Sequence, residues 1–262
     1  LFCKDYFSLP RNILRLVVSF IPEMAVFDLP MAFAKYDGST IDKVLNNPES
    51  KFYKQLAAAY DKAGFHYMGM LQNGTFRLTT ANTNLKDLDA YKGLKIRTMS
   101  NKNHMAFWTA IGAEPTPLAF SELYFALQSG TVNAEENAAD TVVTMNFNEV
   151  QKFLAPTNHV LYTNQLAMNK KAYESLDPAY QKALNQAVSE ALKELAPKLG
   201  EIDKQNKETL EKKGMTIIKY DKSFYDQVLA LDSVKALYKD INSQINGIGD
   251  VLMQELDAAA KK

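Results

Sequence analysis

Apolar positions recur four apart in some segments and two apart in others, and this change of period predicts alternating helices and strands. Apolar residues spaced four apart predict a helix over residues 49–63, after a shorter one over residues 41–47. The next run, FHYMGML, is predicted to be a strand that leads into an Asn-Gly turn pair. TFRLTT follows as a second short strand and carries Arg77. The alternation predicts an α/β fold with parallel strands joined by crossover helices.

The most informative stretch is residues 93–137, where a strand, a helix, a Pro-rich turn, a second helix and a strand are predicted in turn. Arg97 falls at the end of the first of these strands. In open α/β sheets the ligand crevice lies beyond the carboxyl ends of the strands. A guanidinium group there offers two parallel N–H donors that match the two oxygens of a carboxylate. We therefore expect a receptor for a small organic acid, with Arg77 as a second candidate, although both could equally be ordinary surface arginines.

Further polar and aromatic residues fall at the ends of the same elements. Asn137 could add a directional amide contact, and Phe120 an apolar floor for the carbon skeleton of the ligand. Ser100 or Asn101 is predicted to cap the following helix, and both are candidates for the binding site. Asn101, Asn103 and Asn137 are compatible with a hydroxylated sugar acid, and equally with a dicarboxylate or a keto acid.

The sequence supplies no convincing catalytic group. Glu135 and Glu136 are adjacent on a predicted strand, so they should point to opposite faces and cannot act as an acid/base pair. His104 is predicted to lie on the polar face of its helix. Nucleophile-elbow, P-loop and dinucleotide-binding motifs are all absent. With three separated histidines and Cys3 as the single cysteine, we expect no enzyme, no cofactor and no metal site.

A long apolar pattern follows Asp177 and Pro178, which suit the N-cap and the first position of a helix. Apolar residues recur at threes and fours to about Leu210. A helix of about 36 residues would be roughly 54 Å long. We therefore predict that it crosses two lobes and is kinked at Pro197. The alternative is two separate helices broken at residues 197–200.

Charge and composition narrow the class of protein. Thirty basic and thirty acidic side chains cancel in the 262 residues, so no net field favours nucleic acid. No apolar run is long enough to cross a membrane. Residues 1–19 do not form a clean signal peptide, and Cys3 would be a lipidation site only behind one. We expect a soluble protein with a truncated or disturbed N-terminus.

Several motifs resemble the solute-binding subunits of the tripartite ATP-independent periplasmic (TRAP) transporters, in the dicarboxylate-binding receptor family. These motifs are VFDLP at residues 26–30, GLKIR, GA-x-PTP-x-AFSELY-x-ALQ-x-G at residues 112–130, V-x-x-x-EN at residues 132–137, and NEVQKFL. The resemblance covers roughly residues 20–262. It implies that Arg97 forms a salt bridge with the substrate carboxylate. It also implies that Arg77, Phe120 and Asn137 occupy binding positions of the family.

The resemblance also implies an architecture and a cellular role. The fold would be a type II periplasmic-binding-protein plan, with two α/β lobes joined by crossing segments and a long kinked helix, closing over the ligand. We expect lobe I to hold residues 1–75 and about 163–203, incomplete at its N-terminus, and lobe II residues 76–162 and about 204–262. The protein would be a monomeric periplasmic or extracytoplasmic receptor that delivers its acid to a TRAP membrane permease.

Two departures from the family pattern bear on these expectations. The usual VDGQENP is VNAEENA here, which makes Asn133, Glu135 and Ala138 atypical. Glu135 could disfavour a second acidic group on the ligand, or simply face away from the cleft. The opening strand, helix and strand of the family are missing or replaced by residues 1–19, so the first lobe should lack its founding strand.

Two alternatives from other classes remain. A cytoplasmic acid-sensing effector domain shares the two-lobed plan, but no helix-turn-helix or basic surface accompanies it. An enzyme that acts on organic acids in a cleft would need a general base near Arg97, and none is evident.

Overall fold

The computed structural model describes residues 18, 20–72 and 75–261. The expectations about Cys3, about the N-terminal segment and about the Asn-Gly turn pair therefore lie outside the described residues. Within them, no helix is both long and apolar enough to cross a lipid bilayer.

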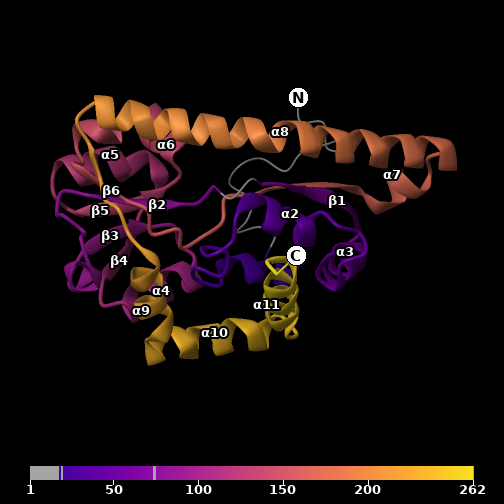
Figure 1. Cartoon of the computed structure of the whole chain (residues 1–262), viewed down its shortest axis with the longest axis horizontal. Coiled ribbons are helices and arrows are strands. Elements are labelled where there is room, and N and C mark those ends of the chain that lie inside the picture. The colour runs from indigo at the N-terminus through magenta and orange to yellow at the C-terminus, as the bar shows by residue number, and fades with distance from the viewer. Residues whose placement is uncertain (1–17, 19, 73–74, 262) are drawn as a thin grey trace.

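The described chain builds one six-stranded sheet and one two-stranded sheet (Figure 1). The strands are β1 Phe65–Leu71, β2 Leu78–Ala81, β3 Lys95–Thr98, β4 Glu114–Pro117, β5 Ala134–Asn137, β6 Phe153–Ala155, β7 Asn164–Asn169 and β8 Thr216–Ile217. The larger sheet has the order β4-β3-β5-β2-β6-β8, and β1 pairs with β7 alone. β3 runs parallel to β4 and β5, whereas β2 is antiparallel to both of its neighbours. The predicted α/β class is confirmed, but the sheet is mixed rather than parallel throughout.

Helices cover both faces of the larger sheet. The helices of the described chain are α2 Gly38–Leu45, α3 Lys51–Lys62, α4 Lys102–Ala110, α5 Leu123–Gln128, α6 Ala139–Thr144, α7 Lys170–Glu174, α8 Pro178–Lys212, α9 Lys222–Ala230, α10 Asp232–Gln244 and α11 Ile248–Ala259. Four 3₁₀ helices join them: η1 Pro22–Asp28, η2 Leu88–Tyr91, η3 Phe120–Glu122 and η4 Phe147–Glu149. α5 and α6 lie above the sheet in Figure 1, and α4 and α9 lie below it.

Local capping explains where the predicted helices begin. α2 starts earlier than expected because the Asp37 side chain accepts a hydrogen bond from the Thr40 amide. Ser50 caps α3 in the same way. One predicted turn is wrong: the EPTP segment forms β4, which lies at the edge of the sheet beside β3. An edge strand can hold proline at positions where the backbone N–H would point to solvent, because no hydrogen bond to a neighbouring strand is lost there.

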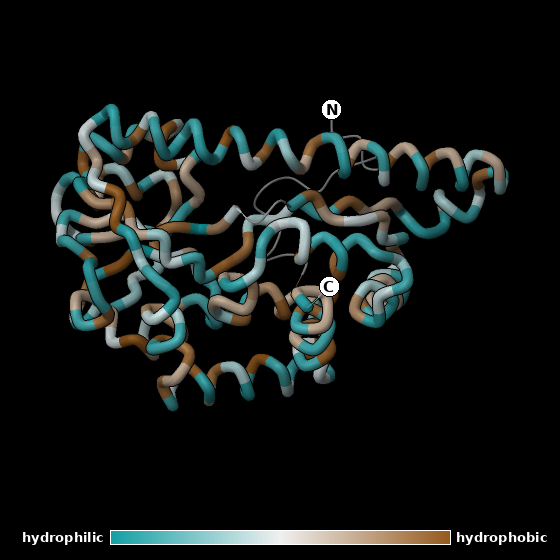
Figure 2. The backbone as a smooth tube through the Cα atoms, viewed as in Figure 1, coloured by the Kyte–Doolittle hydropathy of each residue, from teal (hydrophilic) through white to brown (hydrophobic). Residues whose placement is uncertain are grey.

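The single long helix is confirmed, and the two-helix alternative is wrong. α8 is one helix of 35 residues that continues through Pro197, with the Asp177 side chain accepting a hydrogen bond from the Ala179 amide. It packs against β1 near one end and α6 near the other, so it runs past both sheets (Figure 1). Few of its side chains are buried, and Figure 2 shows hydrophilic residues recurring along it.

The main hydrophobic core joins residues far apart in the chain. It combines η1, α2, α3 and α4 with α9, α10 and α11, and a second cluster lies between the larger sheet, α5, α6 and α8. α11 packs directly on α2 and α3 (Figure 1). The proposed lobe boundaries remain a prediction, and this contact argues for placing residues 248–259 with the first lobe.

Gly69 lies where β1 packs against α8. Its φ is +141°, and a Cβ there would lie 2.6 Å from Cδ1 of Leu192. We expect Gly69→Ala to lower the free energy of unfolding by about 1–3 kcal/mol, because it adds both backbone strain and overpacking. Chemical denaturation would measure this loss. Gly130→Ala is the matched control, since Gly130 has φ +74° with nothing within 4 Å of a Cβ. An equal loss in both variants would show that the approach to α8 does not matter.

Candidate functional site

Arg97 lies near the end of β3, the strand between β4 and β5 in the larger sheet, where the chain turns toward α4. Arg97 is only 3% exposed to solvent. Nε and Nη2 both donate to the carbonyl oxygen of Leu118, at 3.1 and 2.8 Å. This double hydrogen bond fixes the plane of the guanidinium group and leaves its Nη1 end without a hydrogen bond to any described residue.

Arg97 has no ion-pair partner among the described residues. Burial lowers its pKa, while the carboxylates of Glu136 and Glu135 act in the opposite direction. The group nevertheless stays charged at any physiological pH. Of the five N–H donors of a guanidinium, two are used by Leu118, so the Nη1–Nη2 end can receive a carboxylate end-on.

Phe120 lies beside Arg97, and its role as an apolar floor for the ligand stays a prediction. Its ring centroid lies 5.7 Å from Cζ of Arg97, and the residue is 39% exposed. A ligand carboxylate on Arg97 would therefore have an accessible aromatic ring beside its carbon skeleton.

Arg77 lies close to Asn137, but its guanidinium group is already paired with a carboxylate of the chain. Nε and Nη2 of Arg77 form an ion pair with Glu136, in which the distance from Nη2 to Oε1 is 3.0 Å. Nη2 also donates to Oδ1 of Asn137 at 3.1 Å. His159 adds a hydrogen bond from Nε2 to the same carboxylate, at 3.1 Å. A ligand-binding role for Arg77 stays a prediction, and its observed partner is a carboxylate of the chain.

The two adjacent glutamates of β5 are both fully buried. As predicted for neighbours on a strand, their side chains point to opposite faces of the sheet. Burial opposes the ionisation of Glu136, but the charge of Arg77 and the hydrogen bond from His159 outweigh it, so the pKa of Glu136 is lowered. Glu135 instead accepts hydrogen bonds from Oγ1 of Thr80 at 2.8 Å and Nδ2 of Asn137 at 2.5 Å. Because these partners are neutral, burial dominates and raises the pKa of Glu135 to about 7.

The residues after β3 divide between capping and a second polar cluster. Ser100 is exposed, whereas Oδ1 of Asn101 caps α4 by accepting from the amides of Asn103 and His104. The Asp28 carboxylate accepts from Nδ2 of Asn101 and of Asn103, at 3.2 and 3.0 Å. Nε2 of His104 lies 3.0 Å from the same carboxylate, and His104 is buried. The expectation that His104 lies on a polar helix face is wrong, because its imidazole pairs with Asp28.

A family model describes this chain. The model of the bacterial extracellular solute-binding protein, family 7, matches residues 15–244. The chain belongs to this family. Its members are solute-binding receptors rather than enzymes.

Similar proteins agree with the family assignment. A solute-binding protein of Verminephrobacter eiseniae is 33% identical over 224 residues, which are 85% of this chain and 65% of that protein. The sialic acid-binding periplasmic protein SiaP of Vibrio cholerae is 32% identical over 176 residues, 66% of this chain and 52% of its own length. A TRAP periplasmic solute-binding protein of Desulfovibrio salexigens, solved with bound orotic acid, superposes with a TM-score of 0.79 at 26% identity, covering 95% of this chain and 78% of its own.

This chain spans about half to two thirds of the length of the curated relatives that it matches, since the matched segments cover 50% to 65% of those proteins. Its fold is that of the two-lobed TRAP periplasmic solute-binding proteins, as predicted.

Sequence reasoning missed several residues that surround this candidate site. Asp28, His159 and the partnership of Glu136 with Arg77 were not foreseen. Asp28 carried a readable signal, since a lone carboxylate in the apolar VFDLP motif must find polar partners if it is buried. Nothing in the sequence indicated the Leu118 carbonyl oxygen as the group that orients Arg97.

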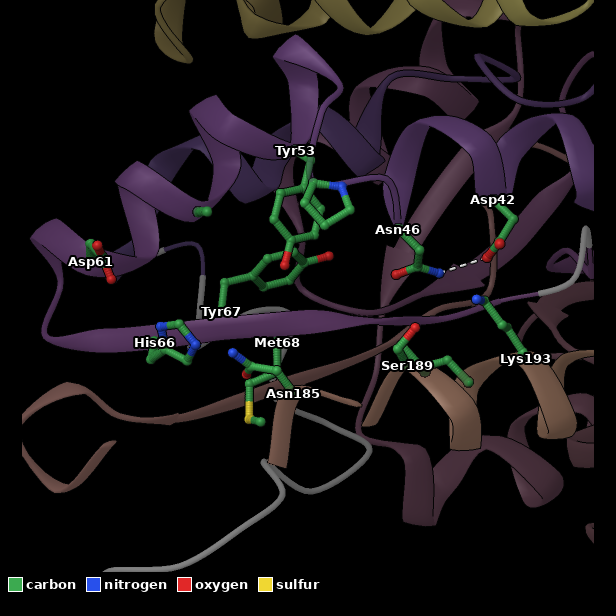
Figure 3. Close-up of a pocket in the computed structure, with 13 residues that line it drawn as sticks. Asp42, Asn46, Tyr53, Asp61, His66, Tyr67, Met68, Asn185, Ser189 and Lys193 are labelled. Carbon is green, nitrogen blue, oxygen red and sulfur yellow. Dashed lines mark hydrogen bonds between the residues drawn. The ribbon is translucent and has the colours of Figure 1, made fainter. Parts of the chain in front are cut away.

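A second candidate region is a cavity of about 330 Å³ between α2, α3, β1 and α8 (Figure 3). Asp42, Asp61, Tyr67 and Lys193 are among its lining residues, and none of the predicted site residues is. Two aspartates against one lysine make this cavity poorly suited to an acid. The candidate acid site is therefore at Arg97. No described group of three or more His, Cys, Asp or Glu side chains could hold a metal ion.

Proposed function

We propose that this chain is a TRAP-type receptor that captures a small organic acid by its carboxylate on Arg97. One observation carries the proposal: Arg97 is buried, charged and without a carboxylate partner among the described residues. Leaving a buried charge unmatched costs about 3–5 kcal/mol. A ligand carboxylate supplies the missing charge, and Leu118 has already oriented the guanidinium group to meet it.

The contacts around Arg97 describe the rest of the proposed site. Phe120 would contact the carbon skeleton of the acid. Asn137 is oriented by Arg77 and Glu135, which leaves one N–H of its amide to donate to the ligand. Asn101 uses its oxygen as a helix cap and one N–H on Asp28, so only its second N–H could contribute, and Ser100 could contribute its exposed hydroxyl.

The relatives support a small acid as the ligand. Similar proteins include a sialic acid-binding protein, a protein solved with bound orotic acid and a sugar acid-binding protein in complex with galactonate. We propose that the two lobes close over such an acid in the periplasm and that a TRAP permease then receives it. We further propose that the chain is not an enzyme, because the described residues offer Arg97 only carboxylates that are already hydrogen-bonded within the protein.

Thermal-shift screening tests this proposal. The panel would contain sugar acids, four-carbon dicarboxylates, keto acids and sialic acid. At a concentration of one hundred times its dissociation constant, a ligand of the native state adds about 2.7 kcal/mol of stability. For a chain of this size that is a rise of about 5–10 °C in the melting temperature. A clear shift with one class of acid is expected. A cooperative melt that no acid shifts would contradict the proposed function.

A further inference from the structure

Arg97 is the one buried basic side chain around the site, among the described residues, that forms no ion pair or hydrogen bond with a carboxylate of the chain. The other basic side chains are each paired with a carboxylate: Arg77 with Glu136, His159 with Glu136, and His104 with Asp28. Each of these side chains is buried or nearly so. The site can therefore match the charge of one ligand carboxylate, and it holds no second cation for another.

Glu135 is the carboxylate that lies opposite Arg97 in the sheet register. The two residues are partners on the neighbouring parallel strands β3 and β5, so their side chains leave the same face of the sheet. They nevertheless form no ion pair, because Arg97 is turned toward Leu118 and Glu135 is held by Thr80 and Asn137. Glu135 is thus a buried carboxyl group whose hydrogen-bond partners are neutral. It lies in register with Arg97, a buried cation that has no ion-pair partner among the described residues.

The charge balance of this arrangement depends on the proton of Glu135. The ion-paired groups Glu136 and Arg77 act on the pKa of Glu135 in opposite directions, Glu136 raising it and Arg77 lowering it, and the charges of Glu135 and Arg97 also act on each other. An ionised Glu135 and a ligand carboxylate would place two like charges around one guanidinium group in a buried site. Like charges sharing a site raise the pKa of one of them until it holds a proton.

We infer that this receptor takes acids with a single carboxylate, and that Glu135 is protonated in the ligand-bound protein. The inference rests on the proposed role of Arg97. The remaining polar groups of the ligand are then neutral hydroxyl, carbonyl or amide groups. A second carboxylate would be buried without a partner, and burying an unpaired charge is costly.

If Glu135 must be protonated in the complex, the dissociation constant of the acid depends on pH in a predictable direction. Burial raises the pKa of Glu135 to about 7, so below that pH the carboxyl group is already neutral before the acid arrives. Above it, binding must add a proton. The dissociation constant should therefore be flat below about pH 7 and rise by about tenfold per pH unit above it.

The selectivity test uses pairs of acids that differ in one terminal group. Isothermal titration calorimetry on the full chain would compare galactonate with galactarate, D-erythronate with meso-tartrate, and 4-hydroxybutyrate with succinate, all at pH 6. The monocarboxylate of the pair that binds is expected to bind at least tenfold more tightly. A dicarboxylate that binds as tightly as its partner overturns the single-carboxylate inference while leaving the proposed function intact. If no acid of these pairs or of the screening panel binds, the proposed function fails, and this inference fails with it.

The proton test uses the tightest of these acids and the variant Glu135→Gln. Between pH 6 and pH 8.5 the dissociation constant of the wild type should rise by about thirtyfold, whereas that of Glu135→Gln should be the same at the two pH values. Titration in two buffers of different ionisation enthalpy should show the uptake of nearly one proton by the wild type at pH 8.5 and none by Glu135→Gln. Glu114→Gln, which changes an exposed carboxylate on β4, is the control and should follow the wild type. A wild-type dissociation constant that stays constant from pH 6 to 8.5 overturns the role of Glu135.

Discussion

Replacing Arg97 with alanine is expected to raise the dissociation constant for the bound acid by about two to nearly four orders of magnitude. The estimate follows from the cost of about 3–5 kcal/mol for leaving one charge of a buried pair unmatched. In the variant the ligand carboxylate would lie beside Phe120 and Glu135 with no cation to meet it. Calorimetric titration of the folded variant with the acid found in the screen measures the effect.

Two further variants make this result specific. Arg97→Lys should also bind more weakly than the wild type, because the ammonium group cannot present two parallel donors. Lys95→Ala removes an exposed cation from the same strand and should leave the dissociation constant unchanged. If Arg97→Ala retained wild-type affinity, Arg97 could not be the residue that holds the carboxylate.

Arg77→Met is expected to lower the free energy of unfolding by about 3–5 kcal/mol, because it leaves the buried Glu136 without its charged partner. For a chain of this size the melting temperature should fall by roughly 6–20 °C. Thermal unfolding followed by circular dichroism would measure the change.

The double variant Arg77→Met/Glu136→Gln separates the unmatched charge from the loss of packing. Removing both charges should recover most of the stability, because the penalty belongs mainly to the carboxylate left behind. A double variant as unstable as Arg77→Met alone would mean that Arg77 acts through the contacts of its side chain and not through its charge.

Locally encoded features of this fold were predictable from the sequence. α8 carries its own start signal in Asp177 and Pro178, and its apolar spacing outweighs the single Pro197. β4 was missed because two prolines in four residues are typical of a turn, and only its place at the sheet edge makes a strand possible. Strand direction also escaped prediction, since the pairing of β2 depends on segments distant in the chain.

The same distinction applies to the site. The position of Arg97 near the end of a strand was predictable because it is a local property, and its binding role stays a prediction. The partners of Arg77 and His104 were not predicted, because Glu136 is 59 positions from Arg77 and Asp28 is 76 from His104. No spacing rule connects residues so far apart. Their pairing decides which arginine remains available, so the difference between Arg77 and Arg97 became visible only in the folded chain.

The packing of α11 on α2 and α3 has a consequence for biosynthesis. A ribosome makes α2 and α3 about two hundred residues before α11. Until residues 248–259 emerge, the apolar side chains of α2 and α3 that α11 covers remain open to water or to other chains. Such exposed apolar surface on an incomplete chain promotes aggregation. The nascent protein should therefore depend on chaperone protection until translation is nearly finished, even though most of its helices can form earlier.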